Sequence, residues 1–120
     1  MLLLQLLKAK LHHARLTYTN PDYVGSIEID ADLMRHVGIH DGELVHIWAV
    51  DHTSRIQTYA FSGPRGVIGM NGGAAHLFKT DDRVIIAAFA LTDEEIVPKI
   101  ALLGEHNEII RDLTPFSVLG

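Results

Sequence analysis

Apolar and polar residues alternate along much of this chain, and the alternation predicts short β-strands. The pattern runs over residues 2–18 and recurs at residues 26–30, 43–50 and 55–61. Because only Asp51–Ser54 separates the last two segments, we expect them to form a hairpin. Further strands are expected at residues 67–70, at the nearly all-apolar residues 83–91, which we expect to be buried on both faces, and at residues 100–103 and 109–113.

Helix signals are few and short. Asp30 can cap a helix over Ala31–Val37, and Gly38 would end it. The segment Thr92–Glu95 is typical of a second helix start, with Pro98 near its end. Because many short strands accompany so little helix, we expect a mainly β chain that folds as a small closed barrel, which has no exposed sheet edge.

Length and composition narrow the class of protein. The chain has 120 residues, of which 48% are hydrophobic and 21% are charged, so we expect a single domain over residues 1–120. The formal charge of -5 argues against a nucleic-acid partner, because phosphate binding needs clustered Lys and Arg. The absence of cysteine excludes disulfides and thiolate nucleophiles. We expect a cytoplasmic protein.

The apolar N-terminal segment Met1–Leu7 does not have the form of a signal peptide. It lacks a basic region before the apolar run, is short, and continues into the charged residues Lys8 and Lys10. No segment reaches membrane-spanning length, so no membrane partner is expected. Such a segment suits a strand buried in a core or at a subunit interface, and we therefore expect an oligomer.

The dipeptide Gly25-Ser26 stands where a polar turn gives way to a strand. It is the only Gly-Ser pair in the chain. Glycine reaches backbone conformations closed to other residues, so a fold can hold the Gly25 carbonyl in a strained pose beside the Ser26 hydroxyl. Attack by that hydroxyl would convert the amide into an ester, and elimination and hydrolysis would then leave a pyruvoyl group. The alternative is a plain turn that enters a strand.

Two cationic positions are candidates for binding carboxylates. Arg55 and Tyr59 lie four positions apart on one predicted strand, so their side chains share a face. A guanidinium suits a carboxylate because it donates two parallel charge-assisted hydrogen bonds. Lys10 and His12 also share a strand face, as does Lys8. The simpler alternative is a solvated arginine beside a tyrosine at the edge of the core.

The segment Asn71–Ala75 is rich in glycine and alanine. Its backbone amides are not covered by bulky side chains, so the segment could form an anion-binding nest or an oxyanion hole at the start of a helical turn. Glycine pairs also occur in ordinary hairpins, and that alternative stays open.

Eight histidines raise the question of a metal site. Only His36 and His40 have the i, i+4 spacing of a helical ligand pair, and Gly38 interrupts that helix. We therefore expect no metal site.

Four motifs occur in a fixed order along the chain. In this combination the sequence resembles the aspartate 1-decarboxylases, pyruvoyl-dependent enzymes that make β-alanine for pantothenate. The resemblance runs from about Lys10 to about Phe89. The motifs are Lys10-Leu11-His12, Tyr23-x-Gly25-Ser26-Ile27-x-Ile29-Asp30, Arg55-x-x-Thr58-Tyr59 and Asn71-Gly72-x-Ala74-Ala75-His76.

The resemblance implies a fold and an assembly. The fold would be a six-stranded double-psi β-barrel with short helices, and the assembly a homotetramer with sites between subunits. Autocatalytic cleavage between Gly25 and Ser26 would give a β-chain of residues 1–25 and an α-chain of residues 26–120, with Ser26 becoming the pyruvoyl group.

The resemblance also implies roles for single residues. Thr58 and Asn71 would assist processing and oxyanion binding, and Tyr59 would be the proton donor. Tyr23 and His12 would shape the cleavage site. Substrate carboxylates would be held by Lys10 and Arg55, and the pocket would be completed by Thr58 and by the amides of Gly72, Gly73 and Ala74.

The implied chemistry is coherent on its own terms. The pyruvoyl ketone would form a Schiff base with the amino group of L-aspartate and accept the electrons released when the α-carboxylate leaves as carbon dioxide. Protonation by Tyr59 and hydrolysis would release β-alanine. Three alternatives stay open: a pyruvoyl decarboxylase for another amino acid, a non-catalytic small barrel such as a transcription regulator, and a family member that cannot mature alone.

Overall fold

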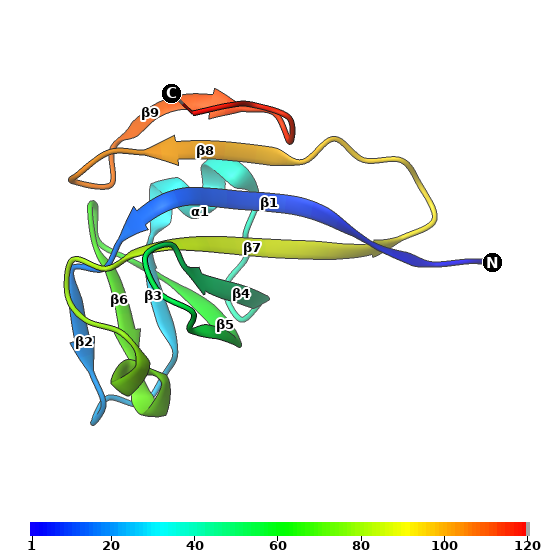
Figure 1. Ribbon diagram of the computed structural model, residues 1–120. Coiled ribbons are helices and arrows are strands. Elements are labelled where there is room, and N and C mark those ends of the chain that lie inside the picture. Colours follow the sequence, from blue (N-terminus) through cyan, green and yellow to red (C-terminus); the bar gives the residue numbers. More distant parts are fainter. Residues whose placement is uncertain (120) are drawn as a thin grey trace.

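Nine β-strands dominate residues 1–119, which are the residues that the computed structural model describes. The mainly β fold expected from the alternating pattern is therefore confirmed. In chain order the elements are β1 (Leu4–Arg15), β2 (Tyr18–Asn20), β3 (Ile27–Asp30), α1 (Ala31–Val37), β4 (Leu44–Ala49), β5 (Arg55–Gly63), β6 (Ile68–Asn71), the 3-10 helix η1 (Gly72–Leu77), β7 (Arg83–Thr92), β8 (Lys99–Leu103) and β9 (Ile109–Leu113) (Figure 1).

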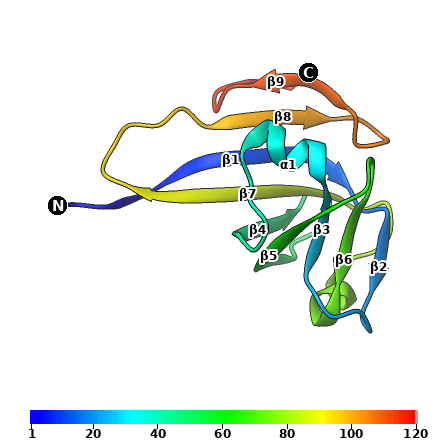
Figure 2. The ribbon, with the colours of Figure 1, turned by 180° about the vertical axis from the view of Figure 1, so that it is seen from behind.

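Six strand segments form a closed ring, seen from opposite sides in Figures 1 and 2. Around the ring, β1 pairs with β7, β7 with β4, β4 with β5, β5 with β3, β3 with β6, and β6 with β2. β1 and β2 belong to one continuous segment that bends between them. There the Leu16 amide donates to the Asp82 carbonyl (3.0 Å) and the Thr17 amide to the Ile68 carbonyl (2.7 Å), which closes the ring.

The predicted barrel is thus confirmed, although the strand expected over residues 2–18 is divided into β1 and β2. The hairpin of β4 and β5 is also confirmed, with Trp48 opposite Arg55 and Leu44 opposite Tyr59. Outside the ring, β8 runs parallel to β1 and β9 pairs with β8. Asn107, in the turn between β8 and β9, accepts from the Arg15 amide (2.8 Å) and donates to the Arg15 carbonyl (2.9 Å).

The short helix α1 follows β3 as expected and has both predicted caps. Asp30 accepts from the backbone amides of Asp32 (2.8 Å) and Leu33 (3.4 Å). Gly38 ends the helix in the left-handed conformation, with φ 84°, and its amide donates to the Met34 carbonyl (2.8 Å). The second carboxylate oxygen of Asp30 accepts from the Gly66 amide (2.7 Å), so one side chain connects β3, α1 and the turn before β6.

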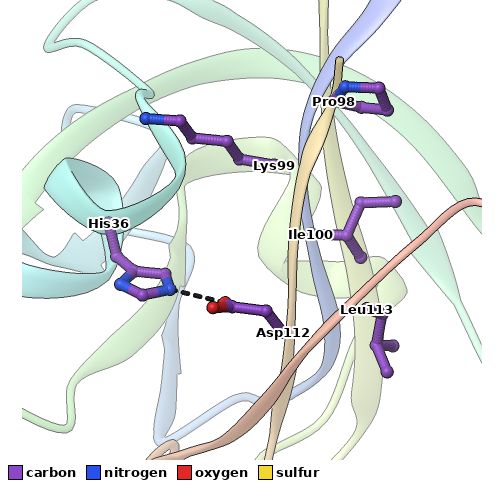
Figure 3. A pocket seen from close by; sticks show the side chains of 6 residues that line it. All are labelled: His36, Pro98, Lys99, Ile100, Asp112 and Leu113. Atoms are coloured by element: carbon purple, nitrogen blue, oxygen red, sulfur yellow. Dashed lines mark hydrogen bonds and ion pairs between the residues drawn. The ribbon is translucent and has the colours of Figure 1, made fainter.

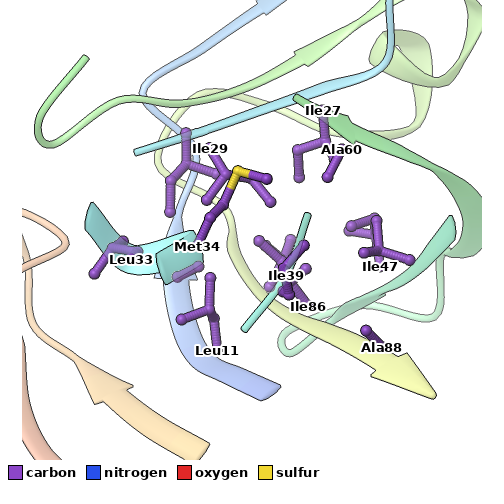
Figure 4. Packing of buried hydrophobic residues seen from close by; sticks show 14 of the residues in the cluster. Leu11, Ile27, Ile29, Leu33, Met34, Ile39, Ile47, Ala60, Ile86 and Ala88 are labelled. Carbon is purple, nitrogen blue, oxygen red and sulfur yellow. The ribbon is translucent and has the colours of Figure 1, made fainter. Parts of the chain in front are cut away.

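Aliphatic side chains from β1, β3, β4, β5, β6 and β7 fill the interior of the ring. Leu11, Ile27, Ile29, Ile47 and Ile86 are fully buried and face one another (Figure 4). Each contributes about 1.5–3 kcal/mol by leaving water. This packing holds β5 and β6 on either side of β3, and that placement positions the candidate site.

Two predictions about the distal part of the chain are wrong. Thr92–Glu95 does not begin a helix: β7 continues to Thr92, which pairs with Leu4 on β1, and residues 93–98 are bends and irregular chain. Backbone pairing with β1 outweighs the local capping signal. Residues 83–91 are not buried throughout either, because Phe89 and Leu91 are 37% and 64% exposed where β1 and β7 extend beyond the ring (Figure 1).

The N-terminal residues Leu2–Leu4 lie at the end of this extension and are exposed, so they do not belong to the core of the barrel. Burial in the core, one of the two placements expected for this apolar segment, is therefore wrong for Leu2–Leu4. Among residues 1–119, no helix is long and apolar enough to cross a membrane.

Candidate functional site

The Gly25-Ser26 bond lies immediately before β3 and has an unusual backbone. Gly25 has φ 130°, a conformation that favours glycine. A Cβ on Gly25 would stand 3.3 Å from Cε1 of Phe61 and 3.7 Å from Cε1 of Tyr23, so two aromatic rings border this residue. Ser26 itself is 4% exposed. The bond therefore lies in a closely packed part of the structure.

Hydrogen bonds from both neighbouring strands fix Ser26. Its hydroxyl oxygen accepts from the Tyr59 amide on β5 (3.0 Å) and from the Ile27 amide (2.5 Å). Its carbonyl accepts from the Asn71 amide on β6 (2.8 Å). The register explains these partners, because Ile27 pairs with Ala60 on one side and with Met70 on the other. Ser26 is thus oriented by residues that lie about 30 to 45 positions away in the sequence.

The carbonyl of Gly25 faces the glycine-rich loop. A Cβ on Gly72 would stand 3.3 Å from this oxygen and 3.8 Å from the Tyr23 carbonyl oxygen. Gly72 has φ 68°, in the left-handed region that favours glycine. The close approach and the backbone conformation both favour glycine at this position. The structure therefore brings Tyr23, Gly25, Ser26, Asn71 and Gly72 together.

Asn71 is 2% exposed and belongs to a hydrogen-bond chain that the sequence did not suggest. Its Nδ2 donates to the Tyr18 hydroxyl (3.1 Å), which donates to Oε1 of Glu28 (2.8 Å). Burial raises the pKa of Tyr18; the hydrogen bond from Asn71 lowers that pKa and the bond to Glu28 raises it further. Among the described residues, Oδ1 of Asn71 has no hydrogen-bond partner.

Tyr59 and Thr58 adjoin this group on β5. The backbone of Tyr59 binds Ser26, while its side chain is 46% exposed and on the same strand face as Arg55, as predicted. Thr58 is half-buried, pairs with Val45 of β4, and points to the opposite face of the strand. Two further members of the predicted site, Gly73 and Ala74, follow Gly72 in η1.

Arg55 lies at the far end of β5 from Ser26. It lies four positions from Tyr59 along the strand, a distance of about 13 Å. Its guanidinium stands 5.5 Å from the ring centroid of Trp48, its partner on β4. Such a stacked guanidinium is held in place while its hydrogen-bond donors stay available. Trp48 was not among the residues predicted from the sequence.

Lys10 and His12 lie on β1, with β7 and β4 between them and β5. Three strand spacings correspond to about 14 Å. Both residues line a cavity of about 120 Å³ together with residues of the C-terminal tail. Lys8 is separated from them by a bulge and pairs with Glu43 (2.6 Å), so it does not share their surroundings.

The His12 ring has a low proton affinity. Burial, and then the neighbouring charges of His13 and Lys10, lower its pKa from 6.5 to about 4. The His12 and His13 rings stack with centroids 4.3 Å apart. Within residues 1–119, Nδ1 of His12 is one of two buried side-chain polar atoms without a hydrogen-bond partner; the other is Oδ1 of Asn71.

A separate groove of about 360 Å³ lies where α1 faces β8 and β9. His36 on α1 contacts Asp112 on β9 (2.7 Å), with Lys99 nearby (Figure 3). None of the predicted site residues lines this groove. Over the described part of the chain, no three or more histidine, aspartate or glutamate side chains are grouped as metal ligands would be.

Comparison with known proteins shows the family of this chain. The family model described as aspartate decarboxylase matches residues 2–110. The chain belongs to the aspartate decarboxylase family. The double-psi β-barrel expected for that family corresponds to the closed six-stranded ring described above.

Curated relatives span nearly the same length. The chain is 48% identical to aspartate 1-decarboxylase of Hyphomonas neptunium over 116 residues, which are 92% of this chain and 98% of the relative. It is 51% identical to aspartate 1-decarboxylase of Exiguobacterium sibiricum over 107 residues, or 84% of both chains. For the enzyme of Halorhodospira halophila, the identity is 46% over 88% of this chain and 89% of the relative.

Proposed function

We propose that this protein is a pyruvoyl-dependent aspartate 1-decarboxylase that converts L-aspartate to β-alanine and carbon dioxide, for pantothenate and coenzyme A synthesis. The observation that carries the proposal is the Gly25-Ser26 bond, whose carbonyl faces Gly72 and whose serine is buried and bound by β5 and β6. These features appear in a chain that belongs to the aspartate decarboxylase family.

Cleavage would proceed at the start of β3, within one chain. The Ser26 hydroxyl oxygen forms a bond to the Gly25 carbonyl carbon, the C–N bond breaks, and the Ser26 nitrogen takes up a proton. Loss of the proton on Cα of Ser26 then expels the Gly25 carboxylate and leaves dehydroalanine. Its imine tautomer reacts with water, releases ammonia, and becomes the pyruvoyl group.

The residues around Ser26 fit such a group. The Asn71 amide holds the Ser26 carbonyl, which stays in the pyruvoyl group, while the Tyr59 amide holds the hydroxyl oxygen that would leave with Gly25. Gly72 leaves room beside the Gly25 carbonyl. When present, the pyruvoyl group accepts the electron pair released as carbon dioxide departs. The exposed Tyr59 hydroxyl would supply the proton that the substrate carbon needs. Thr58, Gly73 and Ala74 would line the pocket, as the resemblance implies.

Substrate carboxylates would be held by Arg55 and Lys10. Within one subunit, the backbone of each of these residues lies more than about 10 Å from Ser26, measured along or across the strands. A second copy of the chain could bring its cations to the Ser26 of the first, and we therefore propose a homotetramer with sites between subunits. The exposed Leu2–Leu4 and Phe89 offer apolar surface for such contacts. We also propose a cytoplasmic location.

The proposed substrate is L-aspartate because two cations suit two carboxylates. A decarboxylase for another amino acid is the competing function. Assays of the purified protein with aspartate, glutamate, histidine and arginine distinguish the two, and preferential turnover of any of the last three would contradict the assignment.

Intact-mass spectrometry of freshly purified protein tests the proposal. We expect two fragments that meet at Gly25 and Ser26, the second with a blocked N-terminus, and borohydride reduction with labelled aspartate should attach the label to residue 26. The Ser26→Ala variant should remain whole. Ser62→Ala, which removes an exposed serine from the same sheet, should cleave like the wild type. An intact, inactive wild type would count decisively against the proposed function.

A further inference from the structure

Three polar side chains cross the outer face of β2, β6 and β3 beside the Gly25-Ser26 bond. Tyr18 on β2 pairs in register with Gly69 on β6, which pairs with Glu28 on β3. The Tyr18 ring occupies the space above Gly69, where any Cβ would overlap it. The Tyr18 hydroxyl thereby crosses β6 and binds Glu28 at 2.8 Å.

Glu28 is confined in the same way. Its side chain lies across Gly63 of β5, where a Cβ would overlap the Glu28 side chain. Two glycines on neighbouring strands thus make room for the Tyr18–Glu28 pair. Because both side chains rest against backbone, neither can easily turn away from the other.

The hydrogen-bond chain has a fixed direction. A carboxylate only accepts, so the Tyr18 hydroxyl hydrogen is directed to Glu28 and the Tyr18 oxygen is left as an acceptor. The NH₂ group of Asn71 donates to that oxygen (3.1 Å). The carbonyl oxygen Oδ1 of Asn71 consequently occupies the other edge of the amide, where it is buried and unpaired among the described residues.

Asn71 and Ser26 are cross-strand neighbours. The Asn71 amide donates to the Ser26 carbonyl, and the next pair along, Met70 and Ile27, points into the core. Because side chains alternate along a strand, Asn71 and Ser26 share the outer face, with Cβ atoms about 4.5–5.5 Å apart. The Ser26 oxygen already accepts from two amides, so its own hydrogen still requires an acceptor.

We infer that Glu28 and Tyr18 are positioning residues that hold the Asn71 amide in one orientation, so that its carbonyl oxygen, which is not hydrogen-bonded to Ser26 in the structure, accepts the hydrogen of the Ser26 hydroxyl as the bond is cleaved. The inference rests on the proposed function, since it concerns the same bond. It gives Asn71 an acceptor role that differs from the oxyanion-binding role implied by the family resemblance.

The test follows cleavage of newly synthesised precursor over time by intact mass. Tyr18→Phe keeps the ring above Gly69 but removes the hydroxyl, and it should slow cleavage about three- to tenfold. Glu28→Gln should slow cleavage to a similar extent, because its amide can donate to the Tyr18 oxygen and reverse the chain. Glu95→Gln, an exposed substitution after β7, should match the wild type.

The double variant distinguishes positioning from general support of the fold. If Glu28 acts only through Tyr18, the Tyr18→Phe/Glu28→Gln protein should cleave no more slowly than Tyr18→Phe alone. Additive slowing, or wild-type rates in Tyr18→Phe, would overturn the inference. Should Tyr18→Phe not fold, an unchanged rate in Glu28→Gln overturns it equally. A wild type that never cleaves removes both this inference and the proposed function, whereas a cleaving wild type with unaffected variants removes only the inference.

Discussion

The two outer faces of the barrel differ in how far one chain satisfies its polar groups. The cleavage face, formed by Tyr18, Ser26, Glu28 and Asn71 on or next to β2, β6 and β3, is connected by hydrogen bonds of 2.8 to 3.1 Å. The cation face is formed by residues of β1, β7, β4 and β5 and carries the outward cations Lys10 and Arg55.

The difference has a physical basis. Asn71 and Ser26 are almost fully buried, and burying a polar group costs free energy unless it is hydrogen-bonded. Nδ2 of Asn71 and the Ser26 hydroxyl oxygen are paired, whereas Oδ1 of Asn71 has no partner among the described residues. Lys10 and Arg55 are more accessible, and neither forms an ion pair with the residues that the structure describes. A solvated cation without an ion-pair partner costs the fold little free energy. This difference is what the proposed function requires, with cleavage organised inside one chain and substrate binding completed by groups from another.

The strongest way to disturb the cleavage face is Gly72→Ala. The added Cβ would press on the Gly25 carbonyl oxygen at 3.3 Å, at a residue with φ 68°. Displacing reacting atoms by 1 Å can slow a reaction about 100-fold, and the shift needed here is smaller, so we expect the rate of cleavage measured by intact mass to fall by about 10- to 100-fold.

Gly38→Ala is the matched control for Gly72→Ala. Gly38 has φ 84° but no atom within 4 Å of an added Cβ. Both substitutions should cost about 1 kcal/mol in the free energy of unfolding, because both place alanine in a left-handed conformation. Only Gly72→Ala should impair cleavage, and equal cleavage rates would show that the close approach has no consequence.

On the cation face, Arg55→Ala should spare cleavage and reduce turnover. Losing a charge-assisted hydrogen bond to a carboxylate costs about 1.5–3 kcal/mol, so kcat/KM for aspartate should fall about 10- to 150-fold. Arg65→Ala, whose side chain is 90% exposed, should change neither quantity. Coexpression of Arg55→Ala and Ser26→Ala chains should restore part of the activity if the site is shared between subunits. If no activity is recovered, Ser26 and Arg55 of the same chain form one site.

The smallest expected effect concerns acid stability. The pKa of His12 is about 4 in the fold against 6.5 for a free side chain, so between these pH values the unfolded chain binds the extra proton and the folded chain does not. The stabilisation is therefore present above pH 6.5 and lost as the pH falls toward 4.

After discounting for the partial exposure of the ring, the free energy of unfolding should fall by roughly 1 kcal/mol over this range. Urea denaturation of Ser26→Ala precursor at several pH values measures the fall. A His12→Gln precursor that loses as much stability on acidification as its parent would contradict the prediction.

The sequence was a good guide where the signal is local. Asp30 and Gly38 cap α1 as expected, and alternation located the strands, because caps and strand faces depend on neighbouring residues. The prediction of a helix at Thr92–Glu95 was wrong because Thr92 pairs with Leu4, 88 positions away, and this pairing sets the backbone conformation of Thr92. Local propensity carries no information about such a distant partner.

The candidate site was predicted in part for the same reason. Ser26 and Gly25 form a recognisable pair, but Tyr18 and Glu28 acquire their relation to Asn71 only through the register of β2, β6 and β3. A glycine at position 69 is the one local sign that a large ring could lie there, and it has meaning only once β2 is placed beside β6.

The segment that closes the ring determines what happens to the products of the proposed cut. Residues 1–25 include β1, which is hydrogen-bonded to β7 and β8, and β2, which is hydrogen-bonded to β6. Breaking the backbone after Gly25 therefore does not release this peptide. The mature molecule would be a two-chain complex, in which a short peptide stays between strands of the longer chain. The ring of strands would stay closed although the backbone between β2 and β3 is cut.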